Sequence, residues 1–528
     1  MDLNDRPRNS GKRKNSNNIK QNNKSGNYNS QKSNSKKSNT QNTRSVNSAP
    51  RGARTKVKIK NLNKEFTIIT YVFLALFMCL TIYLMYYVQF VSEDFMNNPY
   101  NARLDHLSET TIKGDIISSD GEILATTNVD QNGYESRVYP HGDMYAHVVG
   151  YSANGMSGIE KDANYNMLRS NSFFLTKIVN EIAGKKNQGD TVVSTVDSRL
   201  QSAAYNALGN NKGAIICIEP STGKVLAMVS KPDFDPNSIE ANWDEYISDD
   251  ESSVLLNRTT QGLYAPGSTF KMVTLMAYMD QYKDYDDFYY DCNGEYNLSD
   301  HSMHCYNNKA HGPENLLDAF GNSCNCAFSE IGLKLNINGY GKLCDDLLFN
   351  TELPTNLSNT TTSRFSLNAD DSDSTIAQTA IGQGQTMVSP IHMAMLASAI
   401  ANDGLLMKPY VIDHVQNDQG HVVKNYKSQA YGQLIDGNTA AKMDEYMRYV
   451  VTNGTASSLM SDQYCAYGKT GTADFSSDMD KNHSWFVGYA ENYYGKEIAV
   501  AVIVEEVPSG SPYAVPATKE ILDTYFSY

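Results

Sequence analysis

The chain has 528 residues, a net charge of −14, and 40% hydrophobic and 10% aromatic residues. One compact core seldom exceeds about 250–300 residues, so this length indicates two or three domains, and the apolar content excludes a fully disordered chain. Charge is distributed unevenly: residues 1–64 hold 17 Lys and Arg against 2 Asp and Glu, whereas the remainder has a net charge of −29. An acidic body repels phosphate, which disfavours a nucleic-acid-binding function.

The N-terminal part predicts a tail followed by a membrane span. Residues 1–64 have few large apolar side chains to offset the entropy of ordering, so we expect a disordered basic tail. Between Glu65 and Glu93 no residue is charged, which is long enough for a helix to cross a bilayer core of about 30 Å. We predict a transmembrane helix over 65–92 rather than a buried helix or a cleaved signal peptide. The excess of positive charge before it predicts a cytoplasmic N-terminus and an extracytoplasmic body.

The remaining sequence divides into two parts. Residues 93–190 predict a small mixed domain, in which an Asp-Gly turn at Asp120 joins two short strands. Residues 191–528 predict one larger unit with a hairpin near each end and apolar helices between. The strands of these hairpins are 213–218, 224–230, 485–489 and 498–504. Such an order of elements is typical of an α+β fold, an antiparallel sheet that carries helices.

A serine and a lysine three residues apart form the most informative motif. A Pro-Gly pair precedes Ser268 and an apolar run follows it, which predicts that Ser268 lies in the first turn of a buried helix, with Lys271 on the same face. A desolvated lysine has a lowered pKa and can take the proton from a serine hydroxyl, which activates it as a nucleophile. The same spacing between Ser33 and Lys36 in the tail shows that the motif alone means little.

Two later motifs make the S-x-x-K motif significant. Ser323 and Asn325 form S-x-N after a predicted helix, and a K-T-G-T run at 469–472 precedes the last two strands. A lysine and a threonine hydroxyl beside a strand edge can bind a carboxylate. In this order, S-x-x-K, S-x-N and K-T-G resemble the motif set of penicillin-binding proteins and serine β-lactamases. Further matches extend the resemblance to class B penicillin-binding proteins over roughly residues 96–528: Asn257-Arg258, Gly382-Gln383-Gly384 and Phe486-Val487-Gly488.

This resemblance implies a fold and an activity. It implies a penicillin-binding transpeptidase fold at 191–528, with helices on both faces of an antiparallel sheet, on a pedestal (dimerisation-like) domain at 93–190. The implied enzyme is a membrane-anchored serine D,D-transpeptidase, which cross-links peptidoglycan stem peptides through an acyl-enzyme and is acylated by β-lactams. One departure is Lys113 before Gly114, where the family more often has arginine.

Site roles follow from the same resemblance. Ser268 would be the nucleophile and Lys271 its base, while Ser323 and Asn325 would shuttle a proton and bind the substrate amide. The substrate carboxylate would be held by Lys469, Thr470, Gly471 and Thr472. Catalysis would need no cofactor. The implied partners are stem peptides, β-lactams, the membrane and a polytopic glycosyltransferase, with no nucleic acid. A β-lactamase or a penicillin-sensing receptor with the same acyl-serine site remains an alternative.

The cysteines raise a separate question. Seven of the eight follow the predicted span, an odd number that cannot pair completely. Two thiols and two imidazoles within 14 residues, joined by a third thiol if the loops converge, could form a tetrahedral structural Zn²⁺ site. The candidates are Cys292, His301, His304, Cys305 and Cys324. A Cys292–Cys305 disulfide or free buried thiols remain alternatives. His311, followed by a glycine, is predicted to be a loop residue rather than a ligand.

Overall fold

The computed structural model describes residues 62–87, 96, 102–249, 251–299, 301–474, 481–508 and 512–528. The tail predicted over 1–64 lies outside these residues except for its last three. Helix α1 (Leu62–Tyr86) contains a 21-residue segment with a mean hydropathy of 2.4, long and apolar enough to cross a membrane by length and composition. The predicted span continued to 92, whereas the helix ends at Tyr86; residues 88–92 lie outside the described part.

A mixed sheet organises the pedestal. Its strand order is β15-β14-β6-β2-β3-β4, with the predicted Asp-Gly turn joining β2 to β3 in an antiparallel pair. The strands are β2 (Ile116–Ile117), β3 (Ile123–Val129), β4 (Glu135–Val138), β6 (Thr191–Ser194), β14 (Ile412–Gln416) and β15 (Val422–Asn425). Strands β14 and β15 come from far along the chain, so the pedestal is not one continuous stretch of sequence.

Short helices and one buried charge cluster complete the pedestal. The fully buried carboxylate of Glu160 pairs with Lys113 Nζ at 2.6 Å and Arg137 Nε at 2.7 Å. Lys113 thus supplies a cation at the position where the sequence departs from the family. The other elements of the pedestal are α3 (Ala102–Thr110), α4 (Ala146–Val149), α5 (Gly158–Asp162), α6 (Asn164–Leu168), α7 (Phe174–Ile182) and the parallel pair of β1 (Thr111–Ile112) and β5 (Asn187–Gln188).

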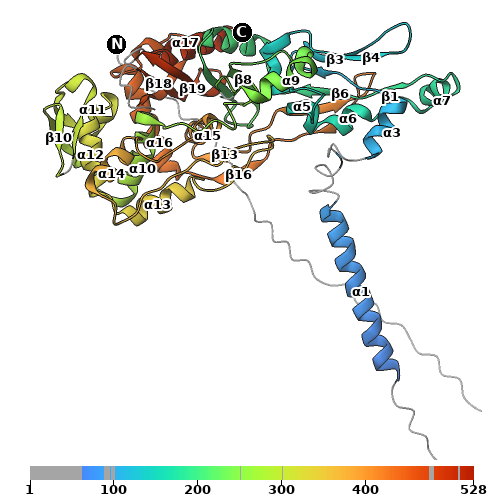
Figure 1. Ribbon diagram of the computed structural model, residues 1–528. Coiled ribbons are helices and arrows are strands. Elements are labelled where there is room, and N and C mark those ends of the chain that lie inside the picture. The colour runs from blue at the N-terminus through green and yellow to red at the C-terminus, as the bar shows by residue number, and fades with distance from the viewer. Residues whose placement is uncertain are drawn as a thin grey trace, which may run out of the picture. The chain divides into compact units, whose positions relative to one another are not determined.

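The larger sheet confirms the predicted α+β fold. Its five strands are antiparallel in the order β17-β18-β19-β7-β8, so the two predicted hairpins meet where β19 pairs with β7. The strands are β7 (Gly213–Ile218), β8 (Val225–Lys231), β17 (Cys465–Asp474), β18 (Lys481–Glu491) and β19 (Glu497–Pro508). Helix α17 (Ala514–Phe526) covers one face and α15 (Pro390–Ala401) the other (Figure 1). Helix α8 (Ser198–Leu208) packs against α17 and against β8.

A helical region lies beside β17 and carries the first two motifs. Its helices are α10 (Lys271–Gln281), α11 (Leu316–Gly321), α12 (Asn325–Lys334), α13 (Ile337–Asp346), α14 (Asp373–Ala380) and α16 (Gly437–Thr452). Side chains at the N-caps define several of these starts: Asn315 accepts from Asp318 N–H, and Cys324 from Ala327 N–H. Helix α10 is buried from Lys271 to Met279, which fits the predicted apolar run.

Small two-stranded sheets lie between α10 and α11. Strand β9 (Tyr289–Cys292) pairs with β12 (Gly312–Asn315), and β10 (Glu295–Asn297) pairs with β11 (Ser302–His304). The remaining elements are α9 (Ile239–Ser248), the 3-10 turn η4 (Gly267–Phe270) and the pair of β13 (Leu405–Met407) and β16 (Ala430–Gln433). Turn η4 runs directly into α10, as expected for a serine at the start of a buried helix.

Candidate active site

The half-buried Ser268 lies in η4, which packs against β17. Gly267 has φ of +53°, and a Cβ there would come within 2.3 Å of the Thr472 carbonyl oxygen. A Cβ at Gly471 would lie 2.8 Å from Thr269 Cγ2. The absence of side chains at these two glycines therefore allows the turn and the strand to approach closely. Two motifs about 200 residues apart thus lie side by side.

The chain before Ser268 is fixed by two further contacts. Gly267 N–H donates to the Gly382 carbonyl at 2.9 Å, and a Cβ at Gly382 would come within 2.0 Å of the Gly267 carbonyl oxygen. Trp485 Nε1 donates to the Ala265 carbonyl at 3.1 Å. The Gly382 contact connects one of the further family matches to the turn that bears the serine, and Trp485, next to another match, holds the residue two positions before that turn.

Lys271 and Lys469 meet at the hydroxyl of Ser323. Lys271 Nζ lies 3.3 Å from Ser323 Oγ and donates to the Ser323 carbonyl and Asn325 Oδ1, each at 2.7 Å. Lys469 Nζ donates to the same hydroxyl at 2.9 Å and to the Thr470 carbonyl at 3.1 Å. The structure therefore brings residues of all three motifs into a single hydrogen-bond network.

Burial sets the charge state of both amines. Both lysines are 0% exposed. Burial lowers the pKa of Lys271 to about 8, and burial together with the charge of Lys271 holds the pKa of Lys469 well below its usual range. An amine with a lowered pKa can accept a proton near neutral pH, which an ordinary lysine rarely does.

Ser323 has a left-handed backbone conformation, with φ of +58°. It lies between α11 and α12, and this conformation is uncommon for a residue with a side chain. The turn presents both its carbonyl and its hydroxyl to Lys271. Such local strain persists only where the surroundings hold it, and it occurs most often at functional sites.

The hydroxyl of Ser268 forms no hydrogen bond with the residues that the structure describes, and the amine of Lys271 is directed at S-x-N instead. Ser268 precedes Lys271 by one helical turn, so the two share a face. Catalytic hydrogen bonds are often long without substrate and tighten in the Michaelis complex. The placement is therefore consistent with the predicted roles of serine and base.

Strand β17 is an edge strand of the five-stranded sheet. Along it Lys469 is buried, Thr470 half-buried and Thr472 exposed. The hydroxyl of Thr455 lies 2.6 Å from that of Thr470, a contact that the sequence did not suggest. A free strand edge beside a lysine and two threonines can bind an extended peptide that ends in a carboxylate.

The cysteine region differs from its prediction in part. Cys292 ends β9, Cys305 directly follows β11, and Cys324 caps α12; all three sulfurs lie in one cluster. His301 and His304 are exposed and lie outside this cluster, because they project from the β10–β11 hairpin to solvent. The imidazole nitrogen in this cluster belongs instead to His311, which we predicted to be a loop residue rather than a ligand. All eight cysteines are free, so the alternative disulfide is absent.

The comparisons with known proteins agree with this fold. Residues 213–523 match the family model described as the penicillin binding protein transpeptidase domain, and residues 113–192 match the penicillin binding protein A dimerisation domain. The chain therefore belongs to the penicillin-binding protein transpeptidase family. Its pairing of a pedestal with a transpeptidase unit is that of the class B penicillin-binding proteins.

Individual relatives cover most of the chain. The peptidoglycan D,D-transpeptidase PbpA of Mycolicibacterium smegmatis is 28% identical, over 79% of this chain and 88% of that protein. The structure of a D,D-transpeptidase domain from Eggerthella lenta has a TM-score of 0.69 at 29% identity, covering 78% of this chain and 98% of its own. A ceftriaxone acyl-enzyme complex of M. tuberculosis penicillin-binding protein A has a TM-score of 0.72 at 25% identity. The match covers 80% of this chain and 99% of the M. tuberculosis chain.

Proposed function

We propose that this protein is a membrane-anchored serine D,D-transpeptidase that cross-links peptidoglycan stem peptides. The single observation that carries the proposal is the Ser323 hydroxyl, which hydrogen bonds with both Lys271 and Lys469. This hydroxyl therefore connects Lys271, the base next to the nucleophile, to Lys469 on the edge strand β17. The names of the relatives, which include peptidoglycan D,D-transpeptidases, and the acyl-enzyme structures of one of them support the same reaction.

Acylation would begin when neutral Lys271 takes the proton of Ser268 and the serine oxygen attacks the carbonyl of the penultimate D-Ala. The backbone N–H groups of Ser268 and Thr472 would stabilise the oxyanion, because η4 and β17 pack directly together. The peptide C–N bond then breaks. The proton would pass through the Ser323 hydroxyl to the leaving amine, which departs as free D-Ala.

The second half-reaction would reverse these roles. The amine of another stem peptide attacks the acyl-enzyme ester, Ser268 leaves with a proton, and a new amide bond forms. Before acylation, Lys469, Thr470 and Thr472 would hold the terminal carboxylate of the donor, and Asn325 would bind its amide. A β-lactam would acylate Ser268 through the same contacts, since its ring amide occupies the place of the scissile bond.

The anchor belongs to the same proposal. Helix α1 has the length and composition of a bilayer span, and the sequence before it has a net charge of +15 over residues 1–64. We infer a single-pass protein with a cytoplasmic N-terminus and an extracytoplasmic catalytic unit. Such a topology places the site where peptidoglycan is cross-linked, and a polytopic glycosyltransferase that supplies glycan strands is the expected partner.

Turnover distinguishes the candidate functions. We expect the full chain in detergent to release D-Ala from a stem pentapeptide and to form a cross-linked dimer with an acceptor amine, whereas Ser268→Ala should do neither. Rapid hydrolysis of nitrocefin without peptide turnover would instead indicate a β-lactamase. Stable acylation without either activity would indicate a penicillin-sensing receptor. Cross-linking by Ser268→Ala at the wild-type rate would contradict the mechanism.

A further inference from the structure

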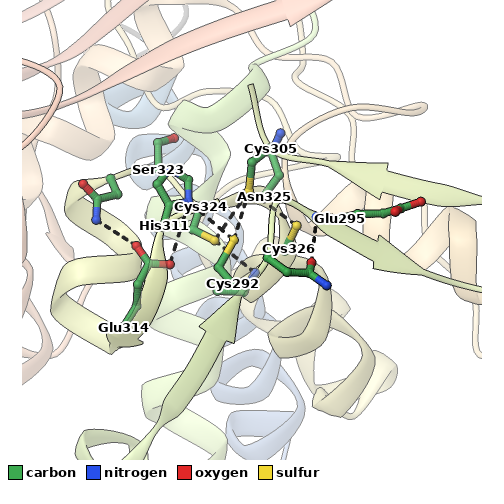
Figure 2. Close-up of polar contacts among 12 residues, drawn as sticks. Cys292, Glu295, Cys305, His311, Glu314, Ser323, Cys324, Asn325 and Cys326 are labelled. Carbon is green, nitrogen blue, oxygen red and sulfur yellow. Dashed lines mark hydrogen bonds and ion pairs between the residues drawn. The ribbon is translucent and has the colours of Figure 1, made fainter. Parts of the chain in front are cut away.

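We propose that Cys292, Cys305, His311 and Cys324 bind one Zn²⁺ ion, and that this ion holds the S-x-N loop in its catalytic position. The four donor atoms lie within 4.8 Å of one another, in a buried cluster beside the active site. Figure 2 shows the sulfurs pointing toward one another between β9, β12 and the start of α12. The consequence for catalysis rests on the proposed transpeptidase function, whereas the metal site itself does not.

The spacing of the donors fits tetrahedral zinc. With Zn–S of about 2.3 Å and Zn–N of about 2.05 Å, a tetrahedron has S···S edges of about 3.8 Å and S···N edges of about 3.6 Å. The sulfur of Cys305 lies 3.7 Å from those of Cys292 and Cys324. Cys292 Sγ lies 3.5 Å from His311 Nδ1. Three measured edges therefore match those of a zinc-centred tetrahedron, and three thiolates with one imidazole are a common structural zinc set.

The proposed ion would crosslink four short segments of the chain. The donors come from four short segments: the end of β9, the residue after β11, the residue before β12 and the N-cap of α12. Cys292 lies opposite Gly312 in the β9–β12 ladder, which brings His311 beside it. A metal bound at these donors would crosslink the four segments and add to the stability that the buried side chains of Cys292, Met303 and Cys305 already provide.

A buried carboxylate gives a second, independent indication. Glu314 is 2% exposed, and its Oε2 lacks a hydrogen-bond partner among the described residues while lying 3.9 Å from His311 Nδ1. Its other oxygen accepts from Asn322 Nδ2 at 2.8 Å. A buried carboxylate oxygen that accepts no hydrogen bond is costly unless a cationic centre lies nearby. Zinc at the four donors would provide that charge, with Glu314 in the outer shell that orients the ligands.

The site is connected to catalysis through neighbouring residues. Cys324 is the middle residue of Ser323-Cys324-Asn325, and its sulfur also accepts the Ala327 N–H at 3.4 Å. Asn325 Nδ2 donates to the carbonyl of His304 at 2.9 Å, next to the ligand Cys305. The metal and this hydrogen bond would therefore fasten the loop with the catalytic serine and amide to the same β11 segment.

Cys326 provides a matched control. Its sulfur lies 3.4 Å from that of Cys305, shorter than a tetrahedral edge, and 4.0 Å from the Met303 carbonyl, to which its thiol donates. It is not one of the four clustered donors. We therefore expect Cys326→Ser to retain the metal. His301→Ala and His304→Ala, which replace exposed side chains, should retain it as well.

The test measures metal and acylation separately on the full chain in detergent. After equilibration with Zn²⁺ alone under reducing conditions, elemental analysis should find about one zinc per chain, and Co²⁺ in its place should give the visible absorption of tetrahedral thiolate coordination. Cys305→Ser and Cys324→Ser should lose the bound metal. Glu314→Gln should weaken zinc affinity roughly 10–100-fold. A chelator should lower the melting temperature of the wild type and slow penicillin acylation about 10²-fold, reversed by Zn²⁺.

Three outcomes would overturn the proposal: a wild-type protein without zinc after this treatment, a Cys292–Cys305 disulfide in the native protein, or loss of zinc in Cys326→Ser with retention in His311→Ala. Acylation that is unchanged in the zinc-free wild type would overturn the positioning role. Ser268→Ala should keep its zinc while losing acylation. A wild type that binds zinc but performs no acyl transfer would refute the proposed function and leave the metal site intact.

Discussion

Replacing Lys271 with arginine removes a titratable base from the centre of the site. An ordinary lysine with a pKa of about 10.4 is neutral in about 0.1% of molecules at pH 7.5. With the pKa of Lys271 at about 8, about a quarter of the molecules carry the neutral amine. Burial thus increases the fraction of molecules in which the Lys271 amine is neutral about 200-fold. Arginine remains charged at any accessible pH, so Lys271→Arg should lose this advantage entirely.

The sign of the pH dependence follows from these charges. Charged Lys271 cannot accept the proton of Ser268, so the acylation rate should rise with pH through about 8 and then level off. Cys324, Cys305 and Glu314 oppose the effect of burial, because negative charge near the amine raises its pKa. Lys469 donates to the hydroxyl of Ser323, which also contacts Lys271. Besides burial, the positive charge of Lys271 lowers the pKa of Lys469, so neutral Lys271 removes this repulsion.

The assay is the second-order rate of labelling by a fluorescent penicillin from about pH 6 to about pH 10, measured on the full chain. We expect a rising profile for the wild type and a loss of about 10²–10⁴-fold for Lys271→Arg. Lys342→Arg, on the exposed side of α13, should retain the wild-type rate. Melting temperatures would check that each variant folds. A flat wild-type profile, or Lys271→Arg with the rate of the wild type, would refute the assignment of the base.

Two further substitutions test the packing of the pedestal and of the turn that bears Ser268. Glu160→Ala leaves Lys113 and Arg137 buried without their shared acceptor and should cost roughly 3–5 kcal/mol of unfolding free energy, measured by urea denaturation of the full chain; a loss near zero would contradict the buried triad. Gly267→Ala places a Cβ against the Thr472 carbonyl and should abolish penicillin labelling. Labelling at the wild-type rate would show that the turn and the strand are not in close contact.

Local sequence patterns predicted the elements that depend on neighbouring residues. The apolar run after Ser268 predicted the buried start of α10, and both hairpins of the large sheet are formed by continuous apolar strands with turn residues between them. The three motifs predicted which residues would meet, because the family resemblance contains information about distant contacts. Composition alone could not have brought Lys469 to the hydroxyl of Ser323.

The features that the sequence did not predict depend on pairing between strands that are distant in the sequence. Strands β14 and β15 extend the pedestal sheet although they follow most of the transpeptidase unit, and no local pattern assigns a strand to a distant sheet. His311 joins the cysteines because the β9–β12 register brings it beside Cys292, whereas its sequence context suggested a loop. The spacing of His311 six residues after Cys305 was the available signal. The exposed His301 shows why proximity in sequence was a poor guide.

The identity of the nucleophile is the claim on which the reaction depends, and one mass measurement tests it directly. Intact mass after treatment with penicillin, followed by peptide mapping, should find a single adduct per chain, on the peptide that contains Ser268. The adduct should be absent from Ser268→Ala under the same conditions. An adduct on another residue, or an unmodified wild type with a native melting temperature, would contradict the account.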